Sequence, residues 1–422
     1  MASAGLIALG AVTVQTANAQ MSGGSDKPWS LSGTLRGFYD DNYNTQPDGP
    51  LRRDSFGFEV RPSASVSWQG DVTTVTASYI YSMRFYEDRP THRADHRHDF
   101  EGFLSHNFSE AYSLELSDSF VIAQEPELLN PSSPATGPFR SNGNNIRNTA
   151  GINLQAKVSS LLTLVLGYGN TLYDYEQKAA DVAPGTVSRS GQLDRIEHAV
   201  TLNSKWQIMP ETSLIFGYQF GLVDYTSDEV ITTAGGTSST RNVRTHTIYG
   251  GVDHTFIPEL SGSVRVGAEI ADFYNDPNNS TASVSPYADL SLTWKYMDTG
   301  SFILGFRHSR NATDVVGTTA TGVTATGGLT LDSESSVVYA SLVHKITPDL
   351  TGTLTGQYQN SSFKGGASAS GDDNFYLLGL NLSYQFNRYL AAEIGYNYDK
   401  LTSGVHPGYD RNRVYLGVTA SY

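Results

Sequence analysis

The feature that most restricts the fold of this 422-residue chain is an alternation of apolar and polar residues with a period of two. From Ser55 to Trp68 the even positions carry Phe, Val, Pro, Ala and Trp, whereas the odd positions carry Ser, Gly, Glu and Arg. A period of two is typical of a β-strand whose two faces meet different environments. The stretch is also longer than the usual globular strand of about 5–6 residues. Because the pattern recurs from residue 29 to residue 422, we expect a single all-β domain.

The distribution of charge between the two strand faces indicates which face is turned outward. From Leu193 to Ile208 the odd positions include Arg195, Glu197 and Lys205, whereas the even positions are mainly apolar. Turning the odd face toward lipid would cost roughly 2–4 kcal/mol for each Arg or Lys near the membrane midplane. A soluble sandwich would instead bury the apolar face. The pattern therefore favours a transmembrane antiparallel up-and-down β-barrel with an apolar outside and a charged inside.

Composition excludes several other classes of protein. Hydrophobic residues make up 39% of the chain, and no apolar run approaches the roughly 18–20 residues of a membrane-spanning helix. The net charge of −14 offers no basic stripe for a nucleic acid. The sequence has no cysteine, which excludes disulfide frameworks, thiolate metal sites and thiol catalysis.

Turn signals divide the chain into hairpins. Eight tight connections are expected, at Gly70-Asp71, Ser109-Glu110, Ser159-Ser160, Pro210-Glu211, Pro258-Glu259, Asp298-Gly300, Pro348-Asp349 and Asn387-Arg388. Nine longer polar loops are expected near residues 42–53, 88–93, 126–144, 177–191, 227–240, 275–281, 314–329, 364–373 and 402–410. These connections separate about eighteen strands, or sixteen if one hairpin is misassigned. An even number is typical of bacterial outer-membrane barrels, whose short turns face the periplasm and whose long loops face outward.

Aromatic residues flank most of the short turns, as expected for a girdle at the membrane interface. They are Trp68, Phe108, Tyr112, Trp206, Phe256, Tyr296, Phe302, Phe386 and Tyr389. Asp118 departs from the pattern because it shares the apolar parity of Leu114 and Phe120. Either a β-bulge at Asp118 or a contact with another subunit would explain this carboxylate.

The first 28 residues are interpreted as an export signal and a linker. Residues 5–14 form an apolar stretch of signal-peptide length, and Ala17-Asn18-Ala19 provides a cleavage site before Gln20. No Lys or Arg precedes Lys27, which a start codon assigned too far downstream would explain; a flexible Ala-rich tail is the alternative. We expect a signal peptide at 1–19, a short periplasmic segment at 20–28 and the barrel at 29–422.

The last strand has a pattern typical of outer-membrane barrels. Its residues Tyr415, Gly417, Ala420 and Tyr422 belong to an alternating segment that ends on an aromatic side chain. This pattern looks like the assembly signal that the barrel-assembly machinery reads, although an ordinary terminal strand is the simpler alternative.

Taken as a whole, the chain resembles the "putative β-barrel porin 2" group of Gram-negative outer-membrane proteins. The resemblance rests on Pro-Asp and Pro-Glu turns that lead into Leu…Gly-x-Tyr strands, on residues 60–63 (VRPS) and on residues 413–417 (RVYLG). It covers nearly the whole mature chain and implies a channel. It brings no catalytic residues.

The alternation also predicts which charged side chains line the lumen. A barrel of about eighteen strands is wide enough to hold water rather than a packed core. Twelve basic and eight acidic residues are expected on the wall: Arg36, Glu59, Arg61, Arg84, Arg97, Asp99, Glu101, Glu115, Arg147, Lys157, Arg195, Glu197, Lys205, Arg265, Glu269, Asp289, Lys295, Arg307, Glu393 and Arg413. Such a mixed, mildly basic wall sets an ion preference, or it simply stabilises the sheet through ion pairs.

Three segments bear on a possible site. The loop at 126–144 is the longest, and it either folds inward to narrow the channel or stays at the surface, stiffened by prolines. His96 and His98 share an outward strand face near the rim, which favours contact with lipopolysaccharide over a metal site, since a third ligand is missing. No G-x-S-x-G, phosphate-binding loop or H-E-x-x-H motif indicates an enzyme.

We therefore expect an outer-membrane porin for the passive diffusion of small hydrophilic solutes, with no metal, cofactor or catalytic residue. The alternatives are an export conduit for exopolysaccharide and a non-conducting structural or adhesive barrel. The expected partners are outer-membrane lipid and lipopolysaccharide, the barrel-assembly machinery, and the solute or polysaccharide, but no nucleic acid. Assembly into a homo-oligomer is left open.

Overall fold

A computed structural model of the protein describes residues 27–124, 143–183, 186–231, 236–276, 282–313, 315, 329–365, 371–405 and 407–422. The expected signal peptide at 1–19 and most of the segment at 20–28 therefore lie outside the described residues. The strands are β1 (Trp29–Asp40), β2 (Ser55–Gln69), β3 (Thr73–Tyr86), β4 (Ala94–Asn107), β5 (Tyr112–Ala123), β6 (Asn145–Lys157), β7 (Leu162–Tyr175), β8 (Arg195–Met209), β9 (Thr212–Tyr225), β10 (Val243–Ile257), β11 (Leu260–Asp272), β12 (Ser283–Met297), β13 (Gly300–Asn311), β14 (Asp332–Lys345), β15 (Leu350–Lys364), β16 (Asp372–Asn387), β17 (Leu390–Ser403) and β18 (Tyr409–Ser421). Short helical turns occur at η1 (Ala179–Asp181), α2 (Arg189–Leu193) and η2 (Ser238–Arg241).

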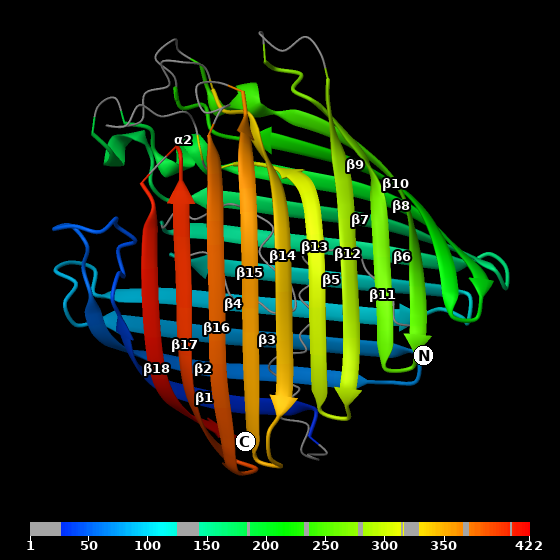
Figure 1. Ribbon diagram of the computed structural model, residues 1–422, viewed down its shortest axis with the longest axis horizontal. Coiled ribbons are helices and arrows are strands. Elements are labelled where there is room, and N and C mark those ends of the chain that lie inside the picture. The colour runs from blue at the N-terminus through cyan, green and yellow to red at the C-terminus, as the bar shows by residue number, and fades with distance from the viewer. Residues whose placement is uncertain are drawn as a thin grey trace.

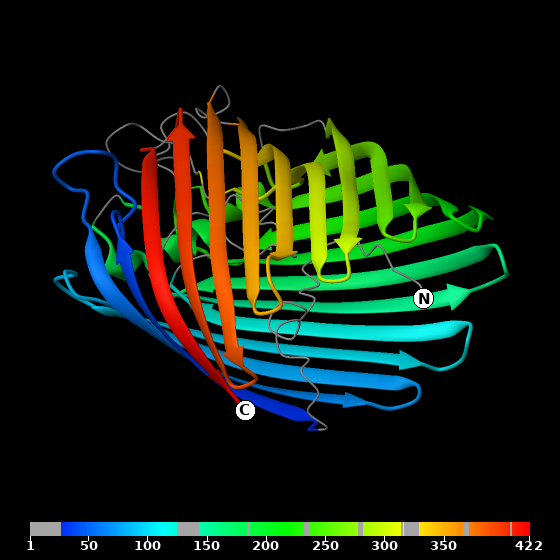
Figure 2. The ribbon, with the colours of Figure 1, turned by 60° about the horizontal axis from the view of Figure 1, so that its bottom comes forward.

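The strands form one closed antiparallel barrel. Each strand pairs with its neighbours in sequence, and the ring closes where β1 pairs with β18, from Ser32↔Ser421 to Asp40↔Arg413. In Figure 1 strands β10–β18 cross the front of the barrel and β1–β9 its back, and Figure 2 shows the same wall from below. The expected fold and the count of eighteen strands are confirmed, and the alternative of sixteen is wrong. In the described part of the chain, no helix is long and apolar enough to cross a membrane.

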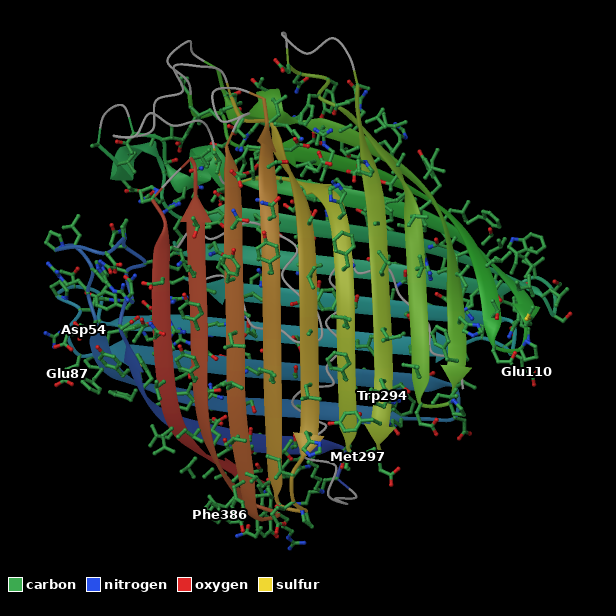
Figure 3. The ribbon with its side chains drawn as sticks, viewed as in Figure 1. Asp54, Glu87, Glu110, Trp294, Met297 and Phe386 are labelled. Carbon is green, nitrogen blue, oxygen red and sulfur yellow. The ribbon has the colours of Figure 1, made fainter. Side chains whose placement is uncertain are left out.

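The short and long connections lie at opposite ends of the barrel. All eight tight turns expected from the sequence join consecutive strands, from β2–β3 to β16–β17. Figure 3 labels Glu110, Met297 and Phe386 at the end with the short turns, whereas Asp54 and Glu87 lie at the end with the long loops. We call these the short-turn end and the long-loop end.

Alternate residues of each strand differ in exposure, which identifies the inner and outer faces. In β1, Leu31 and Leu35 are 50% and 59% exposed, whereas Phe38 and Asp40 are 6% and 0% exposed. In a closed barrel, side chains alternate between the inside and the outside along every strand. The buried set of alternate residues therefore points inward, and the exposed apolar set covers the outside of the barrel. We refer to these two sets as the inward and outward parity of a strand.

Aromatic side chains lie on the outer face near the short-turn end. Of the nine residues expected in the girdle, seven are exposed: Trp68, Phe108, Tyr112, Trp206, Phe256, Phe386 and Tyr389. Tyr296 instead donates its hydroxyl to the carbonyl of Val343 at 3.2 Å. Trp294, labelled in Figure 3, is a further exposed aromatic at this level.

The strand pairing around Asp118 is regular. Asp118 lies opposite Gly102 of β4 and Ala150 of β6, and neither ladder shows a register shift. The proposed β-bulge at Asp118 is therefore wrong. The carboxylate points outward because the strand keeps its normal alternation through this position.

Candidate functional site: the inner face of the barrel

The charged residues expected to line the lumen all occupy inward positions of their strands. In β2, for example, Glu59 and Arg61 share the parity of buried Ser55, whereas Phe58 and Val60 are exposed on the other face. The same holds for Arg195 in β8 and for Arg265 and Glu269 in β11, all of which are buried. The wall therefore brings the twenty residues onto one continuous inner surface.

One network of ion pairs joins the strands on both sides of the barrel closure. The guanidinium of Arg36 lies 3.1 Å from Glu59 of β2 and 2.6 Å from Glu393 of β17. Glu59 also faces Arg84 of β3 at 3.6 Å and accepts a hydrogen bond from Ser82 at 2.6 Å. A single cluster of alternating charge thus joins the consecutive strands β1, β2 and β3 to the sequence-distant strand β17.

A second set of ion pairs lies on the wall formed by β8–β13. Asp253 of β10 binds both Lys205 at 3.2 Å and Arg265 at 2.6 Å. Two strands further along, Arg307 binds Asp289 at 2.6 Å. Asp253 was missed in the sequence analysis, although its odd position in β10 could have identified it.

Pairs within or next to a strand hold most of the remaining charges. Arg97 binds Asp99 at 2.8 Å, and Arg195 binds Glu197 at 2.6 Å. Arg413 binds Asp40 at 2.7 Å across the closure between β18 and β1. Asp40 was missed, as was the buried pair of Arg411 with Asp399 at 3.0 Å. All of these residues obey the inward parity of their strands.

Four basic side chains of the expected set stand apart from this pairing. Within the described residues, no carboxylate lies within 4.0 Å of Arg61, Arg147, Lys157 or Lys295. Glu115 and Glu269 are the corresponding acidic exceptions among these twenty residues, since no ion pair involves either of them in the same part of the chain. The uncompensated charge of this set is therefore mainly positive.

Inward tyrosines pack against the wall instead of projecting freely. The ring of Tyr415 lies over Gly395, and its centroid is 5.0 Å from the guanidinium of Arg36. Tyr249 donates its hydroxyl to Asn203 at 2.6 Å, and its ring centroid lies 5.4 Å from that of Tyr287. These rings fill the space above small residues and support the ion pairs beside them.

At the long-loop end, connections fold against the inner face. Phe273, directly after β11, packs with Val243 and Ala271, and Leu331 from the β13–β14 connection joins the same cluster. Arg241 of η2 is fully buried and donates to the carbonyl of Thr313 at 3.0 Å. Segments from three different connections therefore meet inside this end of the barrel. We call this group of residues the inner cap.

The end of β13 leaves the wall to join the inner cap. Pairing between β12 and β13 stops at Ala288↔His308, whereas pairing with β14 continues to Asn311. The backbone N–H of Arg310 donates to inward-facing Glu269 at 3.4 Å, and its guanidinium binds Asp332 at 2.6 Å. Figure 1 shows the upper end of β13 bending away from β12.

The connection between β7 and β8 is fixed by Asp194, which follows α2. Asp194 accepts a hydrogen bond from the backbone N–H of Tyr175 at 2.7 Å, and it forms an ion pair with Lys178 at 3.1 Å. Burial nevertheless raises the pKa of Asp194 above its ordinary value, against the opposing effects of Ser190, Tyr175 and Lys178. This connection is therefore anchored by a carboxylate that is partly withdrawn from water.

The loop expected to narrow the channel, 126–144, falls almost entirely outside the described residues, so its path stays a prediction. The inner cap, in contrast, is built from the β9–β10 and β13–β14 connections and from the start of the β11–β12 connection. The alternation of apolar and polar residues does not predict it. Arg241, Thr313 and Leu331 lie in loops, where the alternation that identified the wall residues does not apply.

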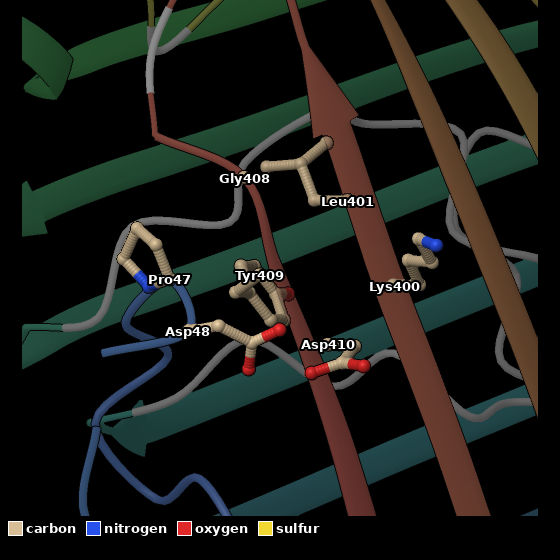
Figure 4. A pocket seen from close by; sticks show the side chains of 7 residues that line it. All are labelled: Pro47, Asp48, Lys400, Leu401, Gly408, Tyr409 and Asp410. Carbon is tan, nitrogen blue, oxygen red and sulfur yellow. The ribbon is translucent and has the colours of Figure 1, made fainter.

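A small pocket lies at the long-loop end, apart from the two ion-pair networks of the barrel wall described above. It is lined by Pro47, Asp48, Lys400, Leu401, Gly408, Tyr409 and Asp410, which Figure 4 shows. Arg52 binds Asp410 at 2.6 Å and Asp41 at 2.8 Å, and it also contacts Asp48. These contacts tie the β1–β2 loop to β18. The pocket therefore forms part of the rim.

The outward histidines near the rim are paired with tyrosines. The hydroxyl of Tyr81 lies 2.7 Å from Nδ1 of His96, and that of Tyr79 lies 3.0 Å from Nδ1 of His98. No group of three His, Cys, Asp or Glu residues suited to a metal ion occurs among the described residues. The contact of these histidines with lipopolysaccharide stays a prediction.

Residues 32–422 match a family whose description is "Putative beta-barrel porin 2". Among solved structures, the chain is similar to OccAB4 of Acinetobacter baumannii, with 13% identity over 94% of this chain and 99% of that chain and a TM-score of 0.45. It is also similar to OpdQ of Pseudomonas aeruginosa, with 12% identity, coverage of 93% and 98%, and a TM-score of 0.43. The FrpB iron transporter of Neisseria meningitidis is similar as well, with 9% identity over 96% of this chain and 83% of that chain and a TM-score of 0.46. No sequence among the curated proteins matches this chain.

Proposed function

Because this chain belongs to the "putative β-barrel porin 2" family, we propose that it is a channel for the passive diffusion of small hydrophilic solutes across the bacterial outer membrane. Closed barrels of about 16–18 strands leave an aqueous lumen, whereas barrels of about eight strands are filled by their own side chains. The observation that carries the proposal is the charged inner wall of an eighteen-stranded barrel.

The unpaired charges support a preference for anions. The field of an ion pair falls off steeply beyond the separation of its two charges, whereas an unpaired charge acts over about one Debye length, roughly 8–10 Å in physiological salt. Arg61, Arg147, Lys157 and Lys295 lack such compensation among the described residues, so their charge reaches further into the lumen. Rings of basic side chains favour anion passage.

The lipid surroundings and the assembly route are part of the same proposal. The exposed leucines, valines and aromatics of the outer face suit a bilayer, and lipopolysaccharide would cover its outer leaflet. Tyr415, Gly417 and Ala420 belong to β18, which closes the barrel against β1, and Tyr422 directly follows this strand. A role for this segment as the signal for assembly machinery fits that position.

Single-channel recording in planar bilayers tests the proposal. The refolded mature chain should give stable current steps, and reversal potentials in a salt gradient should indicate preference for anions. Replacing the unpaired arginines together, R61Q and R147Q, should lower the anion-to-cation permeability ratio about two- to fivefold through the loss of attractive potential. D272N, which removes a charge from the exposed outer face of β11, is the matched control and should leave the ratio unchanged.

A bilayer that stays silent while the barrel is folded would contradict the channel. Folding is monitored by the heat-dependent shift in gel mobility that such barrels show. Silence would shift attention to a conduit that opens only with an exopolysaccharide-export partner, or to a structural barrel. Current steps without any change in the double variant would retain the channel and reject the selectivity mechanism.

A further inference from the structure

One row of residues departs from the apolar character of the outer face. Cross-strand pairing places five residues side by side across β4–β8: Gly102, Asp118, Ala150, Asn170 and His198. Directly paired residues of antiparallel strands point to the same side of a sheet. Even positions of these strands are the outward ones, as exposed Phe100, Ile152 and Val200 show. We call these five residues the polar row.

The polar row lies inside the apolar surface, not at its border. The neighbouring row toward the short-turn end consists of Leu104, Leu116, Ile152, Tyr168 and Val200. The neighbouring row toward the long-loop end consists of Phe100, Phe120, Asn148, Leu172 and Ile196. Eight of these ten side chains carry no polar atom. A carboxylate, an amide and an imidazole are therefore enclosed by large apolar side chains on both sides.

The polar row has spare hydrogen-bonding capacity of both kinds. Asp118 accepts one bond at Oδ1, from the amide of Asn148 at 3.0 Å. Nδ1 of His198 lies 2.9 Å from the hydroxyl of Tyr168 and 3.1 Å from the amide of Asn170. In the part of the chain that the structure describes, Oδ2 of Asp118 and Nε2 of His198 make no hydrogen bond. The row thus offers an acceptor at one side and a potential donor at the other.

Hydrocarbon tails cannot satisfy these groups, and an unpaired buried carboxylate is costly. A lipid phosphate would be repelled by Asp118. A second copy of the same surface, however, supplies what each copy lacks, because a carboxylate of one can meet an imidazole or amide of the other. Gly102 and Ala150 are small and allow the two walls to approach closely. We propose that the polar row is the contact surface for a second copy of this chain within the membrane.

Cysteine crosslinking in membranes tests this contact directly, because the native chain contains no cysteine. A single cysteine at the centre of the row, A150C, should give a band of dimer mass on oxidation. The matched control is A268C, an exposed alanine on the outer face of β11. It should give about tenfold less dimer, a ratio that corresponds to about 1.4 kcal/mol of association free energy. The experiment uses the full chain in its own membrane and does not depend on channel activity.

The charge is tested in the A150C background. D118L replaces the carboxylate by an apolar side chain that lipid accepts, so crosslinking should fall about tenfold. D272L, the same change on β11, should have no effect. Heat-dependent gel mobility confirms that each variant is folded.

Three results would each overturn the proposal: an A150C chain that remains monomeric while a lipid-soluble maleimide labels it, a crosslink to a species of different mass, and crosslinking that D118L leaves unchanged. The interpretation of these crosslinking measurements does not depend on whether the protein is a channel.

Discussion

The inner and outer faces of this barrel are built from the same strands, yet an aspartate has different partners on each face. Inward Asp253 is held between Lys205 and Arg265, at 3.2 and 2.6 Å. Outward Asp118 has one amide, from Asn148, as its partner among the described residues. Both lie in regular strands with unbroken pairing at these positions. Local backbone structure therefore does not decide how a charge is compensated; the medium on each side of the wall does.

At the end of β13, residues at outward positions are buried like inward ones. Arg310 and Asp332 have the parity of outward residues such as Leu304 and Val338, yet their side chains are only 6% and 7% exposed. They are buried because β13 leaves β12 beyond His308 and lies against inward Glu269. Where a strand has left the barrel wall, the side chains at its outward positions pack against protein. Whether a position is inward or outward therefore predicts its environment only where the strand is paired on both sides.

The largest effect is expected from breaking this buried pair. D332A leaves the Arg310 guanidinium buried beside Ser283 without its carboxylate, which should cost about 3–5 kcal/mol of unfolding free energy. The measurement is urea-dependent unfolding in lipid vesicles. Removing both partners, R310A with D332A, should recover part of the loss, because no isolated charge is left. If D332A were as stable as the native chain, the end of β13 would be solvated and the inner cap would not be packed as described.

A charge introduced on adjacent positions of one strand compares the two faces directly. Leu354 of β15 is exposed on the outer face, and Thr355 faces inward. L354R should cost about 2–4 kcal/mol, the penalty for arginine on the lipid side of a barrel. T355R should remain within about 1 kcal/mol, since its guanidinium reaches the lumen. The same urea measurement compares the two variants, and equal losses would mean that the lumen at this level is as dry as the membrane.

Most of the fold could be predicted from the sequence because alternation reports the environment residue by residue. Strand number, turn positions and the inward parity of residues such as Arg61 and Glu393 all follow from that one pattern. The partners of these charges could not be predicted. Arg36 meets Glu393 because the barrel closes between β1 and β18, a contact over 357 residues that no local pattern contains. The inner cap was missed for a related reason: its residues are in loops, where burial depends on the path of the whole connection.

The smallest effects, of opposite sign on the two faces, are expected at glycines. Gly267 of β11 is inward, and a methyl group added there would lie 2.7 Å from the Cα of Tyr249 and against the carbonyl of Ile248. Because backbone atoms of β10 must move, G267A should lose about 1–3 kcal/mol. Gly37 of β1 points outward, and an added methyl group meets no atom of the described residues within 4 Å. Its φ is not in the left-handed region, so G37A restricts the unfolded chain without strain and should gain about 0.4–1 kcal/mol.

These two alanine variants compare the faces without introducing charge, and unfolding in urea can resolve their difference. The expected sign follows from packing alone: the inner surface at Gly267 is filled by Tyr249, whereas no described atom lies within 4 Å of a methyl group added at Gly37. A loss at Gly37 equal to that at Gly267 would show that another molecule covers the outer face of β1. The contact between copies would then extend beyond β4–β8 or lie at a different sector of the barrel. A gain at Gly37 with a loss at Gly267 would leave the outer face of β1 free for lipid and keep the polar row as the favoured contact.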